Sequence, residues 1–119
     1  MILSLDHIQL ALPKGLEAEA RAFYGDLLGL KELEKPEPLC SRGGCWFEGS
    51  GFGLHLGVEA NFRAAKKAHP AFRVADLNAL FLQLEKADFK PDWDTNLPGV
   101  RRFYVHDPFG NRLEFMEKD

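Results

Sequence analysis

The stretch "FYVHDPFGNRLEFMEKD", residues 103–119, predicts a β-hairpin that closes the chain. Its centre, residues 107–111, contains the Asp, Pro, Gly and Asn that are typical of a reverse turn. After this turn Leu113 and Phe115 occupy alternate positions of a strand, and Glu114 lies between them. Successive strand side chains point to opposite faces, so Glu114 points away from the apolar face. A carboxylate in such a strand needs a partner if it is buried.

The composition predicts an ordinary globular chain of one domain. Its 119 residues are 45% hydrophobic and 28% charged, with a formal net charge of −3. This balance argues against disorder and against binding to a nucleic-acid backbone. No apolar run is long enough to cross a bilayer, and residues 1–6 lack the basic start of a signal peptide. We therefore expect a cytoplasmic protein without nucleic-acid or membrane partners, in which Cys40 and Cys45 stay free.

The predicted elements occur in the same order twice. Alternating apolar residues predict strands over residues 2–12, 45–48, 52–58, 69–74, 100–105 and 111–116. Helical spacing predicts helices over residues 16–29 and 77–84, the second one capped by Asp76. We interpret residues 32–41 as a loop or short edge strand, 59–68 as a connector and 91–99 as a loop. The pattern predicts an α+β fold of two βαβββ modules, at about 1–60 and 67–119. They form a curved mixed sheet around a cleft, with the helices on its outer face.

Four side chains that could bind a metal fall on the sheet faces that point away from the predicted helices. Residues two apart share a strand face, and this rule places on the non-helix faces His7, His55, His69 and Glu114. Histidine and carboxylate together suit Zn, Ni, Mn or Fe(II). The pattern therefore predicts a divalent metal ion in the cleft, with Glu114 as one of its ligands. Gln9 and Arg73 share faces with these side chains and could contact a substrate.

A purely structural interpretation of the same residues stays open. A strand histidine is often only hydrogen-bonded, and Glu114 could pair with Arg112 on its own strand or Arg102 on the next. Trp46 could line a pocket or simply belong to the core. Arg102 could bind an anionic substrate group, although solvated arginines are more common. The equivalent placement of candidate ligands in both modules favours the metal interpretation.

Four motifs resemble the vicinal oxygen chelate superfamily over essentially the whole chain: "DHIQLAL", "FYGDLLGL", "HPAFRVADLNAL" and "FYVHDPFGNRLEFME". That group includes glyoxalase I, fosfomycin-resistance thiol transferases, extradiol dioxygenases, methylmalonyl-CoA epimerases and bleomycin-binding proteins. The resemblance implies metal ligands at His7, His55, His69 and Glu114. Glyoxalase I carries a glutamate at the position of His55, so this chain departs from it there. Tyr104 falls where the fosfomycin-type enzymes carry a phosphonate-binding tyrosine, which makes Glu114 and Tyr104 the catalytic candidates.

The resemblance implies a glyoxalase-like, divalent-metal-dependent enzyme acting on a small oxygenated substrate. The reaction would be of the isomerase, lyase or thiol-transfer type, with the metal as a Lewis acid. Two alternatives stay open: a non-catalytic small-molecule or drug-binding protein of the bleomycin-resistance type, and an extradiol-type dioxygenase. The family also implies a homodimer in which His7 and His55 of one subunit meet His69 and Glu114 of the other; a site within one chain is the alternative. The expected substrate-binding residues are Gln9, Trp46, Arg73 and Arg102.

Overall fold

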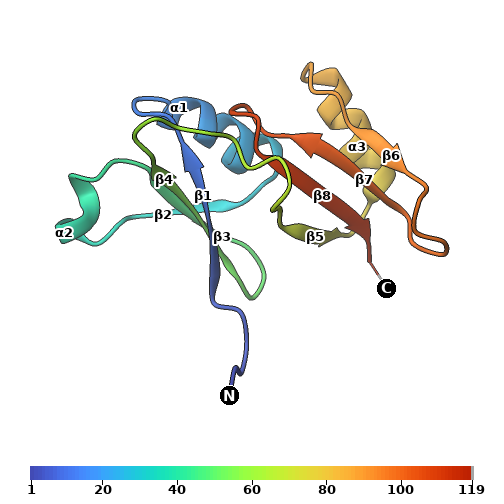
Figure 1. Cartoon of the computed structure of the whole chain (residues 1–119), viewed down its shortest axis with the longest axis horizontal. Coiled ribbons are helices and arrows are strands. Elements are labelled where there is room, and N and C mark those ends of the chain that lie inside the picture. Colours follow the sequence, from blue (N-terminus) through green and yellow to red (C-terminus); the bar gives the residue numbers. More distant parts are fainter. Residues whose placement is uncertain (119) are drawn as a thin grey trace. The chain divides into compact units, whose positions relative to one another are not determined.

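The computed structural model describes residues 1–118, whose strands form two four-stranded sheets (Figure 1). The chain divides into two compact units, Met1–Ala64 and Ala65–Asp119. Each unit contains one βαβββ set of elements with its strands in an equivalent order. The predicted α+β class with tandem βαβββ modules is therefore confirmed. That residues 1–119 make up a single domain stays a prediction.

The first unit is a sheet of order β1-β4-β3-β2 with helical segments in its connections. Its elements are β1 (His7–Leu12), α1 (Glu17–Ala20), a π-helical turn η1 (Arg21–Leu27), β2 (Lys31–Leu33), α2 (Glu37–Cys40), β3 (Cys45–Glu48) and β4 (Gly53–Val58). Phe23 and Tyr24 of η1 are buried, and the Tyr24 ring centroid lies 6.0 Å from that of Phe47 on β3. The apolar faces of η1 and the sheet thus form the core of this unit.

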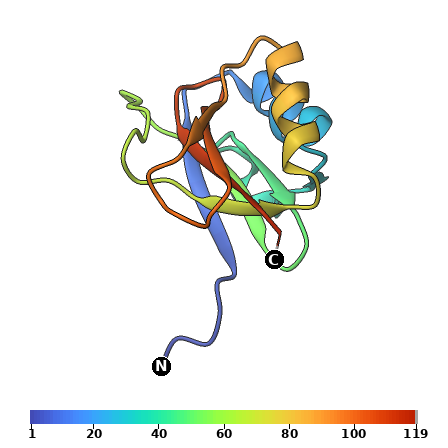
Figure 2. The same ribbon diagram turned by 90° about the vertical axis from the view of Figure 1, so that its right-hand side faces the viewer.

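The second unit is a sheet of order β5-β8-β7-β6 with one regular helix. Its elements are β5 (Ala71–Val74), α3 (Leu77–Lys86), β6 (Asp92–Asp94), β7 (Arg102–His106) and β8 (Arg112–Glu117). The predicted N-cap is confirmed, because the Asp76 side chain accepts a hydrogen bond of 3.0 Å from the Ala79 amide. Helix α3 lies along one side of these strands (Figures 1 and 2), and its apolar side chains Leu77, Leu80 and Leu84 are buried.

The strand register makes two sets of positions equivalent. β1 is parallel to β4, and β5 is parallel to β8, while the remaining neighbours are antiparallel. His55 of β4 lies opposite Trp46 of β3, and Glu114 of β8 lies opposite Tyr104 of β7. The predicted equivalence of His55 and Glu114 is therefore confirmed. The register also makes Trp46 the counterpart of Tyr104.

Several element boundaries differ from the sequence prediction. The strand predicted over residues 2–12 begins only at His7. His7 pairs with Gly53, the first residue of β4, so the residues before His7 have no strand of this sheet to pair with. Residues 1–6 extend away from this sheet (Figure 2). Likewise, β5 begins at Ala71 rather than at residue 69.

Two segments predicted largely as loop contain regular structure. The predicted loop 91–99 contains β6. The segment 32–41, predicted as a loop or short edge strand, contains the end of the edge strand β2 and then α2. β6 has the sequence Asp-Trp-Asp, whose single apolar residue is too few to show an alternation. It is a strand because β7 offers it a hydrogen-bonding edge, with Trp93 opposite Phe103.

Asp107 organises the turn between β7 and β8. Its Oδ1 accepts hydrogen bonds of 2.9 Å from the backbone amides of Phe109 and Asn111. Its Oδ2 accepts one of 3.0 Å from Asn111 Nδ2. Gly110 has a φ of 94°, a left-handed conformation that favours glycine. Asn111 Oδ1 accepts a hydrogen bond of 3.0 Å from the Ala65 amide, so the turn is fixed to the segment that leads to β5.

Candidate functional site

The second unit places a buried carboxylate beside a histidine. Glu114 lies in the middle of β8, and its side chain is 6% exposed. Ala71 of β5 is its register partner, so His69, two residues earlier, shares its face. The Nε2 atom of His69 lies 2.9 Å from Oε1 of Glu114. Parallel pairing of β5 and β8 thus brings two of the four predicted ligands together.

The second ring nitrogen of His69 identifies its tautomer. Nδ1 lies 2.8 Å from the carbonyl oxygen of Lys67, and a carbonyl can only accept, so Nδ1 carries the hydrogen. In a neutral imidazole Nε2 then presents a lone pair to the Glu114 carboxylate. Two lone pairs at 2.9 Å repel unless they share a cation, which is either a proton or a metal ion. Metal-binding histidines usually donate their other N–H to a carbonyl or carboxylate in this way.

Arg102 contacts the other oxygen of Glu114. Its Nη1 donates to Oε2 at 3.2 Å, while Nε and Nη2 both contact Oδ2 of Asp94, at 2.9 and 2.8 Å. The hydrogen bond to Asp94 raises the pKa of Arg102, and the same bond lowers the pKa of Asp94, so both groups stay charged. The alternative that Glu114 pairs with Arg102 is therefore confirmed.

Tyr104 lies next to this group of residues. Its ring centroid is 5.4 Å from that of His69, edge to face. The Arg112 guanidinium lies over the Tyr104 ring, 3.9 Å from its centroid. The sequence also allowed Arg112 to pair with Glu114; the contact seen here is with Tyr104. Arg73 Nη1 donates to the carbonyl of Glu117 at 3.2 Å.

The sequence prediction missed Asp94. It lies in β6, in a segment predicted as a loop, and no periodic pattern marks it. Its side chain is 13% exposed, and the register places it directly opposite Arg102. Opposite charges at facing positions of an antiparallel pair are the signal that would have identified it once β6 was known.

In the first unit three aromatic rings, those of His7, His55 and Trp46, are stacked. They occupy the positions equivalent to His69, Glu114 and Tyr104 of the second unit. The His7 and His55 centroids are 4.3 Å apart at 17°, and those of Trp46 and His55 are 4.0 Å apart at 5°. His7 Nδ1 lies 2.8 Å from Oδ2 of Asp6, so both His7 and its counterpart His69 are oriented through Nδ1. Gln9 is the register partner of His55. The side-chain amide of Gln9 covers Gly57. A Cβ added at Gly57 would lie 2.6 Å from Gln9 Nε2, which is too close for a side chain at that position.

His55 is expected to titrate below the ordinary histidine value. Burial, and then the proximity of His7, lower its pKa from 6.5. As the pH falls through 6.5, the unfolded chain takes up this proton before the folded chain does, so His55 costs stability in acid. Ring NMR across a pH series should place the His55 pKa below 6.5. In His7→Ala the pKa should move only part of the way back, because burial is the larger cause. A His55 pKa at or above 6.5 would contradict this.

The predicted ligands therefore occur as two pairs, His7 with His55 and His69 with Glu114. Over residues 1–118, no three His, Cys, Asp or Glu side chains form a group that could hold a metal ion. Cys40 and Cys45 are free thiols, and Cys45 is buried.

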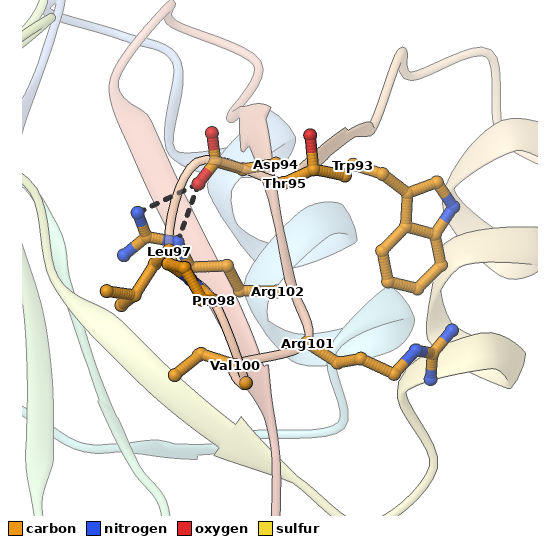
Figure 3. Close-up of a pocket in the computed structure, with 9 residues that line it drawn as sticks. Trp93, Asp94, Thr95, Leu97, Pro98, Val100, Arg101 and Arg102 are labelled. Carbon is orange, nitrogen blue, oxygen red and sulfur yellow. Dashed lines mark hydrogen bonds and ion pairs between the residues drawn. The ribbon is translucent and has the colours of Figure 1, made fainter.

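The hairpin that carries Arg102 also borders a hollow of about 620 Å³. Its lining comes from Trp93, Asp94, Thr95, Leu97, Pro98, Gly99, Val100, Arg101 and Arg102. Figure 3 shows the Arg102 guanidinium turned toward Asp94, whereas the Arg101 side chain extends toward Trp93. The Arg101 guanidinium lies 4.6 Å from the Trp93 ring centroid. The two neighbouring arginines therefore contact different partners, Arg101 the Trp93 ring and Arg102 the Asp94 carboxylate.

The chain belongs to the Glyoxalase/Bleomycin resistance protein/Dioxygenase superfamily, whose family model matches residues 4–115. It is 50% identical to a glyoxalase family protein from Bacillus anthracis, with 100% of this chain and 98% of that chain covered and a TM-score of 0.95. The fold is shared with lactoylglutathione lyase from Agrobacterium tumefaciens, at 21% identity, 96% and 92% coverage and a TM-score of 0.74. It is also shared with the fosfomycin resistance protein FosX from Listeria monocytogenes, at 15% identity, 100% and 96% coverage and a TM-score of 0.79.

A search of curated proteins returned no match to the chain. No helix in the described part of the chain has the length and apolar character needed to cross a membrane.

Proposed function

We propose that the chain is a divalent-metal-dependent enzyme of the glyoxalase type that acts on a small oxygenated substrate. The observation that carries the proposal is the His69–Glu114 pair. Its Nε2 and Oε1 atoms are 2.9 Å apart, and the Nδ1 hydrogen bond to Lys67 turns the Nε2 lone pair toward the carboxylate. Imidazole and carboxylate together suit the metals that the sequence predicts, Zn, Ni, Mn or Fe. His69 and Glu114 would supply two of the ligands of such an ion.

The charges around Glu114 also favour a cation. Glu114 and Asp94 are negative and Arg102 is positive, while His69 with only Nδ1 protonated is neutral. Among these four residues one negative charge is in excess, and the exposed fraction of each side chain is 23% or less; the Arg112 guanidinium over Tyr104 is the next cation. A buried charge of this kind is costly without a counterion. Either a proton on His69 or a metal ion removes that cost.

Each residue of the second unit would have a distinct role. His69 and Glu114 would hold the ion, and the Lys67 carbonyl would keep the His69 ring oriented. Arg102 would orient Glu114 through its hydrogen bond to Oε2, and the Tyr104 hydroxyl would offer a hydrogen bond to a substrate oxygen. When bound, the ion supplies Lewis acidity toward substrate oxygens. In this proposal His7 and His55 complete the coordination from the partner chain of a homodimer, as the family resemblance implies.

One observation favours a second function, a small-molecule-binding protein without a metal. Arg102 already donates to Glu114 Oε2, and a proton on His69 would satisfy Oε1. The carboxylate would then be fully partnered by protein groups alone. Such a protein would use the same polar face for binding only.

Elemental analysis of protein purified without chelator or metal-affinity resin tests the proposal. We expect about one equivalent of Zn, Ni, Mn or Fe per chain, and a rise in Tm when that ion is added to metal-depleted protein. His69→Ala and His7→Ala should each lose the metal, because each removes a proposed ligand. His106→Ala is the matched control, since this exposed histidine of β7 lies outside both pairs. Wild-type protein that holds no metal, and whose Tm no divalent ion raises, would contradict the metal-dependent proposal and favour the second function.

A further inference from the structure

We propose that residues 1–5 form an apolar arm that binds, in a second copy of this chain, the hollow of the β6–β7 hairpin. The arm has the sequence Met-Ile-Leu-Ser-Leu. The hollow has a volume of about 620 Å³ and is lined largely by the loop between β6 and β7. The inference concerns an interaction surface and needs no metal ion, so it stands independently of the proposed metal site.

The arm exposes a run of large apolar side chains. Ile2 is 91% exposed and Leu3 is 94% exposed, and Met1 and Leu5 are exposed as well. Residues 1–6 belong to no helix or strand, and they extend away from the strands of the first unit (Figures 1 and 2). Contiguous apolar surface of this kind is unfavourable in water and marks interaction sites. The arm therefore needs an apolar surface that covers it.

The β6–β7 hairpin is the other place where large apolar side chains are exposed together in the described part of the chain. Leu97 is 43% exposed, and Trp93 is exposed as well. Pro98 and Val100 join them in the lining of the hollow, and Figure 3 shows their side chains on the loop that follows β6. The volume of the hollow falls within the usual range for binding pockets, roughly 300–1,000 Å³. It can therefore take side chains of an apolar segment.

The charged groups that border the hollow already have partners. Arg102 donates to Asp94 at 2.9 Å, and Arg101 Nη1 contacts Glu117 Oε1 at 3.4 Å. An uncharged segment can cover these groups without leaving any of them buried and unpaired, whereas a charged one would compete with the existing ion pairs. The side chains of residues 1–5 are all uncharged, so the arm matches the hollow in charge as well as in polarity.

The spacing of the leucines suits recognition of an extended segment. Alternate residues of such a segment share one side, so Leu3 and Leu5 would point the same way, roughly 7 Å apart. Pockets for alternate side chains are the usual means by which proteins bind an extended peptide. A second copy is the occupant because the same chain leaves both the arm and the hollow exposed. Two copies related by a two-fold axis would exchange arms, and the dimer would contain the contact twice.

Sedimentation velocity over a concentration series, without added metal, tests the inference. We expect wild-type protein to be dimeric. Leu3→Glu and Leu97→Glu should each weaken the dimer by about a hundredfold or more, because burial of one leucine is worth about tenfold and the contact occurs twice. Leu82→Glu is the matched control, since it makes the same change at an exposed leucine of α3 outside both surfaces. It should leave the dimer unchanged.

Cross-linking identifies the two surfaces directly. The exposed thiol of Cys40 is first removed by Cys40→Ser. Leu3→Cys protein is then mixed with Leu97→Cys protein and oxidised, so that a disulfide between these two positions can join only different copies. We expect mass spectrometry to find this linked pair, because the contact brings the two backbones close enough for a disulfide. Leu3→Cys mixed with Leu82→Cys should give far less of it.

Each outcome decides the inference. Wild-type protein that sediments as a monomer throughout the series overturns it. So does a dimer that Leu3→Glu and Leu97→Glu leave intact, although a metal site shared across another interface would survive that result. A chain with both cysteines that links only within a monomer would show that the arm binds its own hollow, which overturns the assignment to a second copy. An arm-dependent dimer that holds no metal would support the inference and contradict the proposed function alone.

Discussion

Glu114→Gln is expected to weaken metal binding by more than about a hundredfold. Replacing a residue that only supports a metal ligand already costs about 10–100-fold in affinity, and Glu114 is proposed as a ligand itself. The glutamine side chain keeps the size of the glutamate, so the packing around β8 should survive. Its NH₂ group can donate directly to His69 Nε2, at the position where Oε1 now lies 2.9 Å away. The glutamine amide would then occupy the His69 Nε2 lone pair. The ion would lose the negative charge of the carboxylate and also the free histidine nitrogen.

Direct titration with Co²⁺, followed by competition with Zn²⁺, measures this loss. The matched control is Glu117→Gln, on the same strand. The Glu117 side chain is 53% exposed and contacts Arg101 at 3.4 Å, away from His69. The control should bind the ion as wild type does. Equal affinities in Glu114→Gln and wild type would show that Glu114 is not a ligand and would assign it to the Arg102 ion pair alone.

Asp107→Ala is expected to destabilise the protein by about 3–5 kcal/mol, since buried groups left without a partner cost about 1–3 kcal/mol each. Asp107 is 4% exposed, and its carboxylate accepts hydrogen bonds from the amides of Phe109 and Asn111 and from Asn111 Nδ2. Alanine leaves all three donors without this acceptor. Urea unfolding followed by circular dichroism would give the difference in free energy.

Two further variants show whether the loss comes from the turn. Asp107→Asn keeps one side-chain oxygen and should lose less stability than Asp107→Ala. Asp92→Ala removes an exposed aspartate of β6 and should change the free energy of unfolding by no more than about 0.5 kcal/mol. A change of similar size in Asp107→Ala would mean that Gly110 and the strands, rather than the carboxylate, hold the turn.

The two-residue alternation of the strands was enough to predict which side chains share a face. Leu54 and Leu56 are buried on one face of β4, and His55 is on the other; Leu113 and Phe115 flank Glu114 in the same manner. The internal repeat then made His7 equivalent to His69 without any knowledge of the fold. These predictions depend on local geometry alone, which a strand imposes on any sequence.

The two-residue alternation could not predict which other residues contact the His69–Glu114 pair. Asp94 lies in a strand that exists only because β7 pairs with it, and Arg73, on the face of Glu114, donates to the carbonyl of Glu117. The pairings of Arg102 with Asp94 and Glu114 join residues on three different strands.

The sequence by itself determined the βαβββ repeat, the apolar faces and the candidate ligands, because strand and helix periods act between residues that are near in the chain. The tertiary structure decided the partners: the Nδ1 bond that turns His69 toward Glu114, the Asp94 clamp on Arg102, and the stack of His7, His55 and Trp46. Hydrogen bonds and ring contacts depend on the register of strands that meet only after folding. Sequence spacing does not encode that register residue by residue.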